Sequence, residues 1–471
     1  MLDNNYYKKA SFNDKAQVVL SKKDNIHSGT DDGNDVISTN YQMNTKEELL
    51  TYDLNNDESK NNSSVITFGC RLNIYESELI KANIRNSSVT GAVVFNTCAV
   101  TKQAEQDAVK SIRKYRRENP DAEIIVTGCA AQTNPDLFSS MPEVDKILGN
   151  EEKLYAHNYL KGSERIILED IMTLKELAPH YVNHFTEHSR AFLQVQNGCD
   201  HRCTFCIIPY ARGNSRSVPI GQIVTQVRSL VANNYKEIVL TGVDVTSYGN
   251  DLPGKPSLGQ MIRRLLNLVP ELKRLRLASI DVAEIDEELL ELMKHEERLM
   301  PYFHISIQAG DDMILKRMKR RHKRNDVIKF CDQIRSYRKN VTFGADMITG
   351  FPTETNEMFM NSLKLVEEAN LQFLHIFPYS ERPGTPASRM PQVEKNIRKE
   401  RAKILRDAGA KNLDIFSKKM HGQREKILIE KNNKGHAENF LSVNINSKIQ
   451  EGTIVNTLLE YRSGELIGIS L

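Results

Sequence analysis

The chain has 471 residues, of which 27% are charged and 39% are hydrophobic, and its formal net charge is +3 at pH 7. At about 150 residues per domain, this length predicts roughly three globular domains. No apolar run reaches the roughly 18 residues of a membrane helix. The N-terminus has neither the apolar core of a secretory signal nor the acid-poor composition of a transit peptide. The sequence therefore predicts a cytoplasmic protein that does not bind a membrane.

The first 63 residues differ in composition from the rest of the chain. They are rich in Asn, Asp, Ser and Lys and show little apolar periodicity. Because such a stretch has too little apolar surface to bury, it is predicted to be a largely disordered extension spanning residues 1–63.

Three short apolar runs follow, and each ends in a cysteine. They are "SSVITFGC", "GAVVFNTC" and "AEIIVTGC", which end at Cys70, Cys98 and Cys129. The spacing of about 30 residues fits one strand and one helix per repeat, and an amphipathic stretch lies between the second and third runs. The carboxyl ends of parallel strands share one sheet edge, so the three cysteines are expected to meet there. This predicts an open α/β sheet domain over residues 64–165.

Six further strand-like runs alternate with amphipathic helical stretches over residues 185–408. This repeat predicts a full or partial barrel of parallel strands, in which functional residues lie at the carboxyl ends of the strands. The runs are "AFLQVQNGC", "EIVLTGVD", "RLRLASID", "HISIQAG", "VTFGADMITGF" and "FLHIFPYS". Residues at or near their ends are Cys199, Asp244, Asp281, Gln308 and Tyr379. Residues 412–471 contain short strand-like runs separated by turn residues, which predict a small β-barrel.

The segment "NGCDHRCTFC" places Cys199, Cys203 and Cys206 within eight residues. Three thiolates this close can ligate three irons of a [4Fe–4S] cluster and leave the fourth iron open. Zinc is the alternative, but it usually takes four ligands, and His201 in this loop does not have a usual ligand spacing. Cys331 lies on the apolar face of a predicted helix and is interpreted as a small buried hydrophobe. Seven cysteines, an odd number, suit a reducing compartment.

This motif, with the aromatic Phe205 before its last cysteine, resembles that of the radical S-adenosylmethionine enzymes. In that family the open iron binds the amino and carboxylate groups of S-adenosylmethionine. Reduction by an electron donor protein then cleaves the cofactor to a 5′-deoxyadenosyl radical. The resemblance also implies the fold of the central region, a partial (βα)6 barrel of the TIM type.

The resemblance narrows to the methylthiotransferases. "TFGCRLNIYESE", "FNTCAVT" and "VTGCAAQ" look like the three motifs of their N-terminal domain, whose cysteines hold a second [4Fe–4S] cluster. Glu76 and Ser77 in the first motif are interpreted either as neighbours of that cluster or as a helix cap. "CIIPYARGNSRS", "DMITGFPTET" and "FPYSERPGTPAS" match the same family, as does a C-terminal barrel of the TRAM type. The resemblance thus implies that two clusters are ligated by six catalytic cysteines, Cys70, Cys98, Cys129, Cys199, Cys203 and Cys206.

Within the family, "GCRLNIYESE" resembles the enzymes that act on N6-threonylcarbamoyladenosine in tRNA. Enzymes for N6-isopentenyladenosine more often read Gly-Cys-Gln-Met-Asn there, and the variant that acts on a ribosomal protein is a more distant match. The implied reaction adds a methylthio group to C2 of the modified adenosine at position 37. It uses one S-adenosylmethionine to methylate sulfur and a second to abstract hydrogen from C2. A non-catalytic, metal-stabilised RNA-binding protein is the alternative from another class, but it does not explain two cysteine triads.

The resemblance assigns four more residues to S-adenosylmethionine. Thr241, Gly242 and Asp244 lie in "TGVD", a region that touches the amino-acid part of the cofactor in the family. Gly350 in "ITGFP" is expected to support the adenine. From the residues alone, a loop cap is the alternative explanation of Asp244 and a tight turn that of Gly350, and the cofactor role is favoured for Asp244.

Three basic stretches are candidates for RNA contact. They cover residues 110–117, 316–324 and 395–431. A solvated helix face is the default interpretation of such runs, although neutralisation of phosphates by Lys and Arg drives RNA binding. The resemblance implies that the partner is the anticodon loop of tRNA, a single-stranded segment of the kind that proteins read readily.

Overall fold

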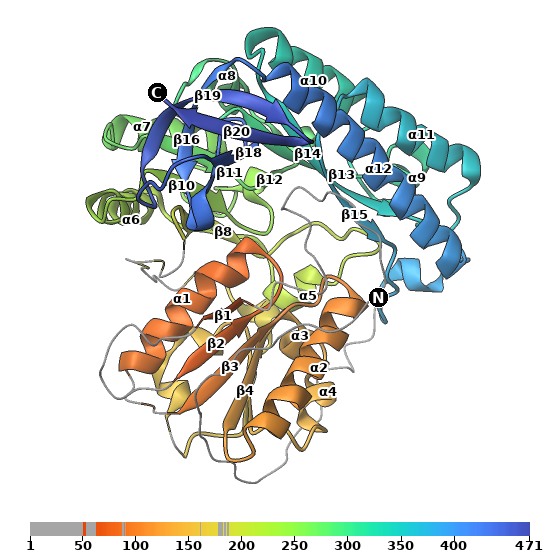
Figure 1. Cartoon of the computed structure of the whole chain (residues 1–471). Helices are drawn as coiled ribbons and strands as arrows, with labels where there is room; N and C mark the ends of the chain where they lie inside the picture. The colour runs from red at the N-terminus through yellow and green to blue at the C-terminus, as the bar shows by residue number, and fades with distance from the viewer. Residues whose placement is uncertain are drawn as a thin grey trace.

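The computed structural model describes residues 50–52, 63–86, 89, 91–160, 162–177, 182, 185 and 188–471. Its N-terminal part, drawn in orange in Figure 1, is built on a sheet with the order β1-β2-β3-β4-β5-β6. Strands β2 to β6 are parallel, and β1 pairs antiparallel to β2 at the edge. The elements are β1 (Leu50–Tyr52), β2 (Ser64–Thr67), α1 (Arg71–Asn86), β3 (Ala92–Thr97), α2 (Lys102–Glu118), β4 (Glu123–Gly128), α3 (Cys129–Thr133), α4 (Pro135–Ser139), β5 (Lys146–Leu148) and β6 (Ile166–Ile167).

The central strands of this sheet are buried on both faces. Val93 packs on the side of α2 with Ile112, while Val94 packs on the side of α1 with Ile80. Burial on both faces explains why these strands read as continuous apolar runs without alternation. The opposite side of α1 contributes Leu72 and neighbouring residues to the core of the barrel, so this helix joins the two parts of the molecule.

The central part is a partial barrel of parallel strands, as expected. Two sheets with the orders β11-β10-β7 and β12-β13-β14-β15 make up six strand positions, because β11 and β12 are successive pieces of one position. The strands are β7 (Ala191–Gln194), β10 (Glu237–Thr241), β11 (Arg274–Leu277), β12 (Ser279–Ile280), β13 (Tyr302–Gln308), β14 (Thr342–Thr349) and β15 (Phe373–Pro378). The helices are α5 (Ile208–Arg212), α6 (Ile220–Ala232), α7 (Leu258–Leu268), α8 (Glu287–His295), α9 (Asp312–Met318), α10 (Arg324–Tyr337) and α11 (Asn356–Glu368).

The C-terminal part is a closed barrel with the order β16-β17-β18-β20-β19, which confirms the predicted small β-barrel. Its strands are β16 (Arg424–Ile429), β17 (Lys434–His436), β18 (Ser442–Ile445), β19 (Ile454–Arg462) and β20 (Glu465–Ser470). Helix α12 (Lys395–Lys419) leads into it, with Leu405 in the core of the large barrel and Leu413 in the core of the small one. The predicted boundary at residues 408–412 therefore lies inside one continuous helix. Figure 1 shows α12 along the outside of the large barrel.

Within the predicted extension at residues 1–63, the structure describes Leu50–Tyr52 and Ser63. Leu50–Tyr52 forms the edge strand β1, which the polar composition of this stretch does not predict. The rest of that prediction lies outside the described residues. In the described part of the chain, no helix is both long and apolar enough to cross a membrane.

Candidate functional site

The clustered cysteines lie on a loop whose base is closed by a short two-stranded ladder. Strand β8 (Gln196–Asn197) follows β7 and pairs antiparallel with β9 (Arg216–Ser217). Gly198 opens the loop with φ of +75°, and a Cβ there would lie 1.9 Å from the carbonyl oxygen of Asn214. Because a side chain cannot be accommodated at this point, glycine is required for the loop to leave the barrel as it does.

The tip of the loop is held against the barrel rim. The Thr204 hydroxyl donates to the Arg317 carbonyl at 2.8 Å, and the Ala387 N–H donates to the Thr204 carbonyl at 2.9 Å. Phe205 packs edge to face on Phe351, with ring centroids 6.4 Å apart. The structure therefore places Phe205 beside the "ITGFP" turn, one of the two segments that the resemblance assigns to the cofactor.

Two carboxylates surround the histidine of the loop. His201 Nε2 lies 3.0 Å from Asp244 Oδ2 and 3.2 Å from Glu284 Oε1. Asp244 and Glu284 raise the pKa of His201 to about 10, so the ring is cationic at neutral pH. Cys199 Sγ lies 3.6 Å from Asp244 Oδ2. Asp244 thus lies between His201 and Cys199. The contacts of His201 are with carboxylates, which agrees with the prediction that the loop cysteines, and not this histidine, ligate the metal.

The three strand-end cysteines do meet at one edge of the N-terminal sheet. Cys98 follows β3, Cys129 follows β4, and Cys70 lies between β2 and α1. Two side chains connect Cys70 and Cys129: Asn73 Oδ1 lies 4.0 Å from Cys70 Sγ and 2.6 Å from Arg212 Nη2, and Arg212 Nε lies 3.2 Å from Cys129 Sγ. Burial raises the pKa of Cys98 to about 12. Gly69 has φ of +92°, and a Cβ there would lie 2.7 Å from Cys98 Sγ. The close approach of these turns therefore depends on glycine.

A buried arginine joins the two cysteine groups. Arg212 ends α5, just after the cysteine loop, and its Nε donates to Cys129 Sγ at 3.2 Å. Its two Nη atoms lie 2.7 and 2.9 Å from the carboxylate of Glu76, which also accepts from Lys153 Nζ at 2.7 Å. Although burial raises the pKa of Glu76, Arg212 and Lys153 lower it to about 2. Glu76 lies inside α1, so the helix-cap interpretation is wrong.

The donor set around the cysteines fits iron–sulfur clusters. The Val100 N–H donates to Cys98 Sγ at 3.5 Å, and Asn150 Nδ2 donates to Cys129 Sγ at 3.8 Å. Hydrogen bonds to sulfur of this kind are one means by which proteins tune such clusters. In the loop, burial raises the pKa of the Cys206 thiol to about 12.

The residues predicted to bind the cofactor lie close to the loop or on the barrel rim. The two glycines among them are also required by packing, because a side chain at either position would clash with its neighbours. Thr241 ends β10 and is buried. A Cβ at Gly242 would lie 2.7 Å from the carbonyl oxygen of Gln196. Gly350 has φ of +65°, and a Cβ there would lie 2.4 Å from Arg398 Cγ. Gly350 is therefore more than a turn marker, because it allows α12 to approach the strand end.

The barrel lumen contains a row of polar side chains that sequence reasoning missed. We call Tyr302, His304, Asp346 and His375 the lumen row. The Tyr302 hydroxyl lies 2.9 Å from His304 Nδ1, and Asp346 Oδ1 lies 3.0 Å from His304 Nε2 and 3.1 Å from His375 Nδ1. The available signal was a polar residue within each of the apolar runs "YFHISI", "FGADMI" and "FLHIF". A polar residue within an apolar barrel strand can point into the barrel interior, toward the place where binding and catalytic sites form.

Two arginines of the basic run at residues 316–324 form ion pairs with carboxylates at the end of the barrel that carries the cysteine loop. The side chain of Arg320 is 9% exposed, and its Nη2 lies 3.1 Å from Asp281 Oδ2. Arg321 is bound to Glu284 at 2.6 Å and to Asp281 at 3.1 Å. The default interpretation of a solvated face is therefore wrong for Arg320, whereas the side chain of Arg321 is 41% exposed.

The other basic stretches differ in exposure. In residues 110–117, the side chains of Lys110 and Arg113 are 73% and 55% exposed, so this face of α2 is open to solvent. In residues 395–431, Arg398 and Arg401 are buried against the large barrel. The face of α2 is thus open to an RNA backbone, and the second stretch also offers exposed lysines such as Lys399 and Lys418.

Two family models match the chain. The Radical SAM superfamily matches residues 193–366, which contain the cysteine loop, and Uncharacterized protein family UPF0004 matches residues 62–149, which contain the strand-end cysteines. Among solved structures, the radical S-adenosylmethionine methyltransferase TsrM from Kitasatospora setae shares the fold. Its TM-score is 0.50 at 15% identity, and the match covers 67% of this chain and 74% of that one.

Curated relatives match nearly the whole length. The threonylcarbamoyladenosine tRNA methylthiotransferase MtaB of Rickettsia prowazekii is 60% identical over 405 residues, covering 86% of this chain and 94% of that protein. MtaB of Aquifex aeolicus is 34% identical, covering 83% and 98%. A tRNA-2-methylthio-N(6)-dimethylallyladenosine synthase of Ehrlichia canis is 32% identical, covering 79% and 88%. With identity at this level over most of both chains, the protein belongs to the radical S-adenosylmethionine methylthiotransferase family.

Proposed function

We propose that the protein is a tRNA methylthiotransferase that adds a methylthio group to C2 of N6-threonylcarbamoyladenosine at position 37. It uses two [4Fe–4S] clusters and two molecules of S-adenosylmethionine. The relatives from R. prowazekii and A. aeolicus, at 60% and 34% identity, have this nucleoside in their names. The E. canis relative has dimethylallyladenosine in its name at 32% identity, so the 60% match favours the threonylcarbamoyl substrate.

The observation that carries the proposal is the pairing of two cysteine triads through one buried arginine. Arg212 ends α5, the helix that follows the loop triad, and donates to Cys129 of the other triad at 3.2 Å. A methylthiotransferase needs a site for radical formation and a site that holds sulfur, both within reach of one base. Two unrelated structural metal sites would have no need of this connection.

We assign each triad to one cluster. When bound, the clusters and S-adenosylmethionine supply one-electron reduction and the transferred sulfur and methyl groups. The protein holds these groups and the base in one place and limits the access of water. Arg212 and Glu76 fix the distance between the triads, and His201 and Asp244 set the charge beside the loop. The cluster ligands are Cys70, Cys98, Cys129, Cys199, Cys203 and Cys206, and the residues that line the cofactor are Phe205, Thr241, Gly242, Asp244 and Gly350.

The proposed partners follow from the chemistry of this reaction. The substrate is the anticodon loop of tRNA, and the exposed basic face of α2 at residues 110–117 supports contact with its phosphates. The small C-terminal barrel, a fold that binds nucleic acid elsewhere, supports further contact with RNA. Reductive cleavage requires an electron donor protein, and the free thiols suit the reducing cytoplasm.

The test is mass spectrometry of nucleosides after anaerobic reaction of the reconstituted enzyme. Two tRNAs are supplied in parallel, one with threonylcarbamoyladenosine and one with isopentenyladenosine at position 37. We expect a methylthio mass gain on the first alone, and about eight irons per chain from two four-iron clusters. A gain on the isopentenyl tRNA alone would contradict the substrate assignment while leaving the chemistry intact.

A pair of variants separates catalysis from folding. Cys199→Ala is expected to abolish cleavage of S-adenosylmethionine, because the loop cluster loses a ligand. Cys331→Ala is the control, since Cys331 is a cysteine of the same domain that packs in the core of the barrel on α10. Cleavage that persists in Cys199→Ala, or that is lost equally in both variants, would overturn the assignment of the loop triad.

A further inference from the structure

Three side chains of the lumen row come from three neighbouring strands of the large barrel. His304 lies on β13, Asp346 on β14 and His375 on β15. Asp346 pairs with His375 in the parallel register, and His304 pairs with Gly344, two residues before Asp346. Because residues two apart on a strand point to the same face, the three side chains project from one face of the sheet. Rigid strands therefore hold all three.

The nitrogen and oxygen atoms of these side chains converge. Asp346 Oδ1 lies 3.0 Å from His304 Nε2 and 3.1 Å from His375 Nδ1. One atom from each side chain can be chosen so that all three lie within 4.8 Å of one another. Zinc bound at about 2.0–2.1 Å holds neighbouring ligand atoms roughly 3.3 Å apart. The two distances to Asp346 are thus those of ligands that share an ion as well as those of hydrogen bonds.

The charge of the row favours a cation between these atoms. Among the described residues, Asp346 forms ion pairs with the two histidines and with no lysine or arginine. Burial lowers the pKa of His304, although Asp346 opposes this effect, so the His304 ring is neutral. Burial raises the pKa of Asp346, but the two histidines hold it below its usual range. A neutral imidazole and an ionised carboxylate are the forms that bind metals.

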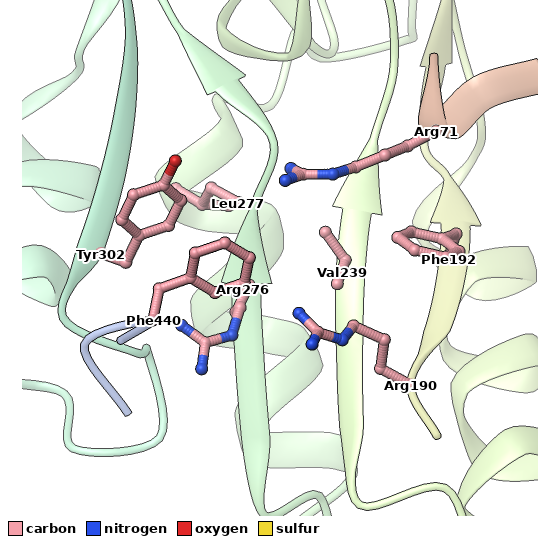
Figure 2. Close-up of a pocket in the computed structure, with 8 residues that line it drawn as sticks. All are labelled: Arg71, Arg190, Phe192, Val239, Arg276, Leu277, Tyr302 and Phe440. Atoms are coloured by element: carbon pink, nitrogen blue, oxygen red, sulfur yellow. The ribbon is translucent and has the colours of Figure 1, made fainter. Parts of the chain in front are cut away.

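The contacts around His304 hold its ring in the orientation of a metal ligand. The Tyr302 hydroxyl lies 2.9 Å from His304 Nδ1, which leaves Nε2 toward Asp346. Histidines that bind metals commonly form a hydrogen bond through the other ring nitrogen in this way. Figure 2 shows the hydroxyl of Tyr302 directed away from Phe440, on which the Tyr302 ring stacks at 4.6 Å. Gly344 leaves room for both rings, because a Cβ there would lie 2.5 Å from the hydroxyl and from His304 Nδ1.

The row is closed on one side and accessible on the other. The side chain of His304 is 4% exposed, whereas those of Asp346 and His375 are 24% and 23% exposed. A water-sized group therefore reaches the carboxylate and the second histidine. Three protein ligands with one accessible side are the arrangement of a catalytic zinc site, in which water or substrate takes the remaining position.

We propose that His304 Nε2, Asp346 Oδ1 and His375 Nδ1 bind one divalent cation, in a site that goes beyond the proposed function and uses neither cysteine group. Two imidazoles and a carboxylate are a ligand set for zinc and for non-haem iron(II). The remaining positions of the ion hold water or an oxygen atom of a molecule bound in the barrel, which the ion polarises.

The test is zinc binding by the untagged, full-length enzyme after both clusters have been reconstituted. Iron then occupies the cysteines, so elemental mass spectrometry counts zinc separately. After gel filtration we expect about one zinc per chain beside about eight irons. X-ray absorption at the zinc edge should show nitrogen and oxygen ligands at about 2.0–2.2 Å and no sulfur at about 2.3 Å.

Variants of the row connect the bound zinc to its ligands. Asp346→Asn and His375→Asn should lose the zinc and keep the iron. Tyr302→Phe, which removes only the hydroxyl, should weaken zinc binding by about 10- to 100-fold. His295→Gln is the matched control, because His295 lies 3.6 Å from Glu291 in an exposed histidine–carboxylate pair on α8. It should bind zinc as the wild type does.

Three results would overturn the inference: a wild type that binds no zinc, zinc bound through sulfur, or equal zinc contents in the wild type and Asp346→Asn. If a variant loses its iron as well, the absorption spectrum of the wild type decides alone. Imidazole ligands without sulfur support the site, and sulfur ligands contradict it. Methylthio transfer is measured separately, so failure of this site leaves the proposed function standing.

Discussion

At the scale of single residues, Arg212 is a buried positive charge whose stability depends on its partners. Its guanidinium is buried and makes contact with a carboxylate, Glu76, and a sulfur, that of Cys129, on the other side of the junction. A buried charge of this kind is tolerated only when its partners compensate the lost hydration. Removal of the arginine leaves Glu76 with Lys153 alone and removes a donor from the sulfur.

We therefore predict that Arg212→Gln lowers the free energy of unfolding by about 3–5 kcal/mol, as for other broken buried ion pairs. It should also lower the iron content of the strand-end site. Thermal unfolding and iron per chain measure the two effects. Arg202→Gln is the control, because Arg202 lies on the cysteine loop that precedes α5 but is exposed. Equal melting temperatures and iron contents in the two variants would contradict this role.

At the scale of elements, the turn that follows β17 in the small barrel closes the base of the large one. Arg276 donates to the carbonyls of Glu438 and Ala437 at 2.8 and 2.9 Å. Phe440 stacks on Tyr302 with ring centroids 4.6 Å apart, and the guanidinium of Arg276 lies 5.1 Å from its ring. This turn is thus part of the wall of the large barrel as well as part of the small one.

Phe440→Ala should consequently destabilise the contact between the two barrels. The expected loss is about 3–5 kcal/mol, which is usual when a buried phenylalanine is truncated. Differential scanning calorimetry should show a lower first transition, and limited proteolysis should release the small barrel sooner. Tyr337→Ala is the comparison, since Tyr337 is 54% exposed and its removal should change stability little. An equal response of the two variants would refute this account of the junction.

At the scale of the whole molecule, buried ion pairs tie the three parts together. Glu237 in the large barrel is bound to Arg276 and Arg190, and Arg190 is bound to Glu430 of the small barrel. On the other side, Arg382 of the large barrel is bound to Glu105 of α2 at 2.7 Å. The parts are therefore held together by charge as well as by apolar packing.

The Glu237 pair predicts loss of stability in acid. Although burial raises the pKa of Glu237, Arg276 and Arg190 lower it from 4.5 to about 2. Because the folded-state pKa is the lower one, the stabilisation is complete above pH 4.5 and is lost as pH falls toward 2. The loss is about 3 kcal/mol at most, at 1.36 kcal/mol per pKa unit.

Melting temperature measured between pH 6 and pH 3 tests this. Glu237→Gln should melt lower than the wild type at neutral pH and should show a shallower decline in acid. Glu271→Gln, which changes an exposed carboxylate, should follow the wild-type curve. A Glu237→Gln curve parallel to that of the wild type would show that this carboxylate is not responsible for the acid response.

The sequence by itself was enough to predict the three folded parts and the location of both cysteine groups. Parallel strands buried on both faces read as apolar runs, as in "GAVVFNTC", and their carboxyl ends necessarily share an edge. The position of Cys70, Cys98 and Cys129 at that edge follows from local pattern alone. The spacing of the loop cysteines is likewise a local property, because Cys199, Cys203 and Cys206 lie on one loop.

Only the tertiary structure decided which distant residues meet. Arg212 and Cys129 are 83 residues apart, and nothing in either local stretch indicates that they touch. The lumen row combines residues from three strands, and a single polar residue in an apolar run does not reveal its neighbours. Contacts of this kind depend on how whole elements dock, and docking is determined by the sum of many side-chain contacts that no short stretch of sequence contains.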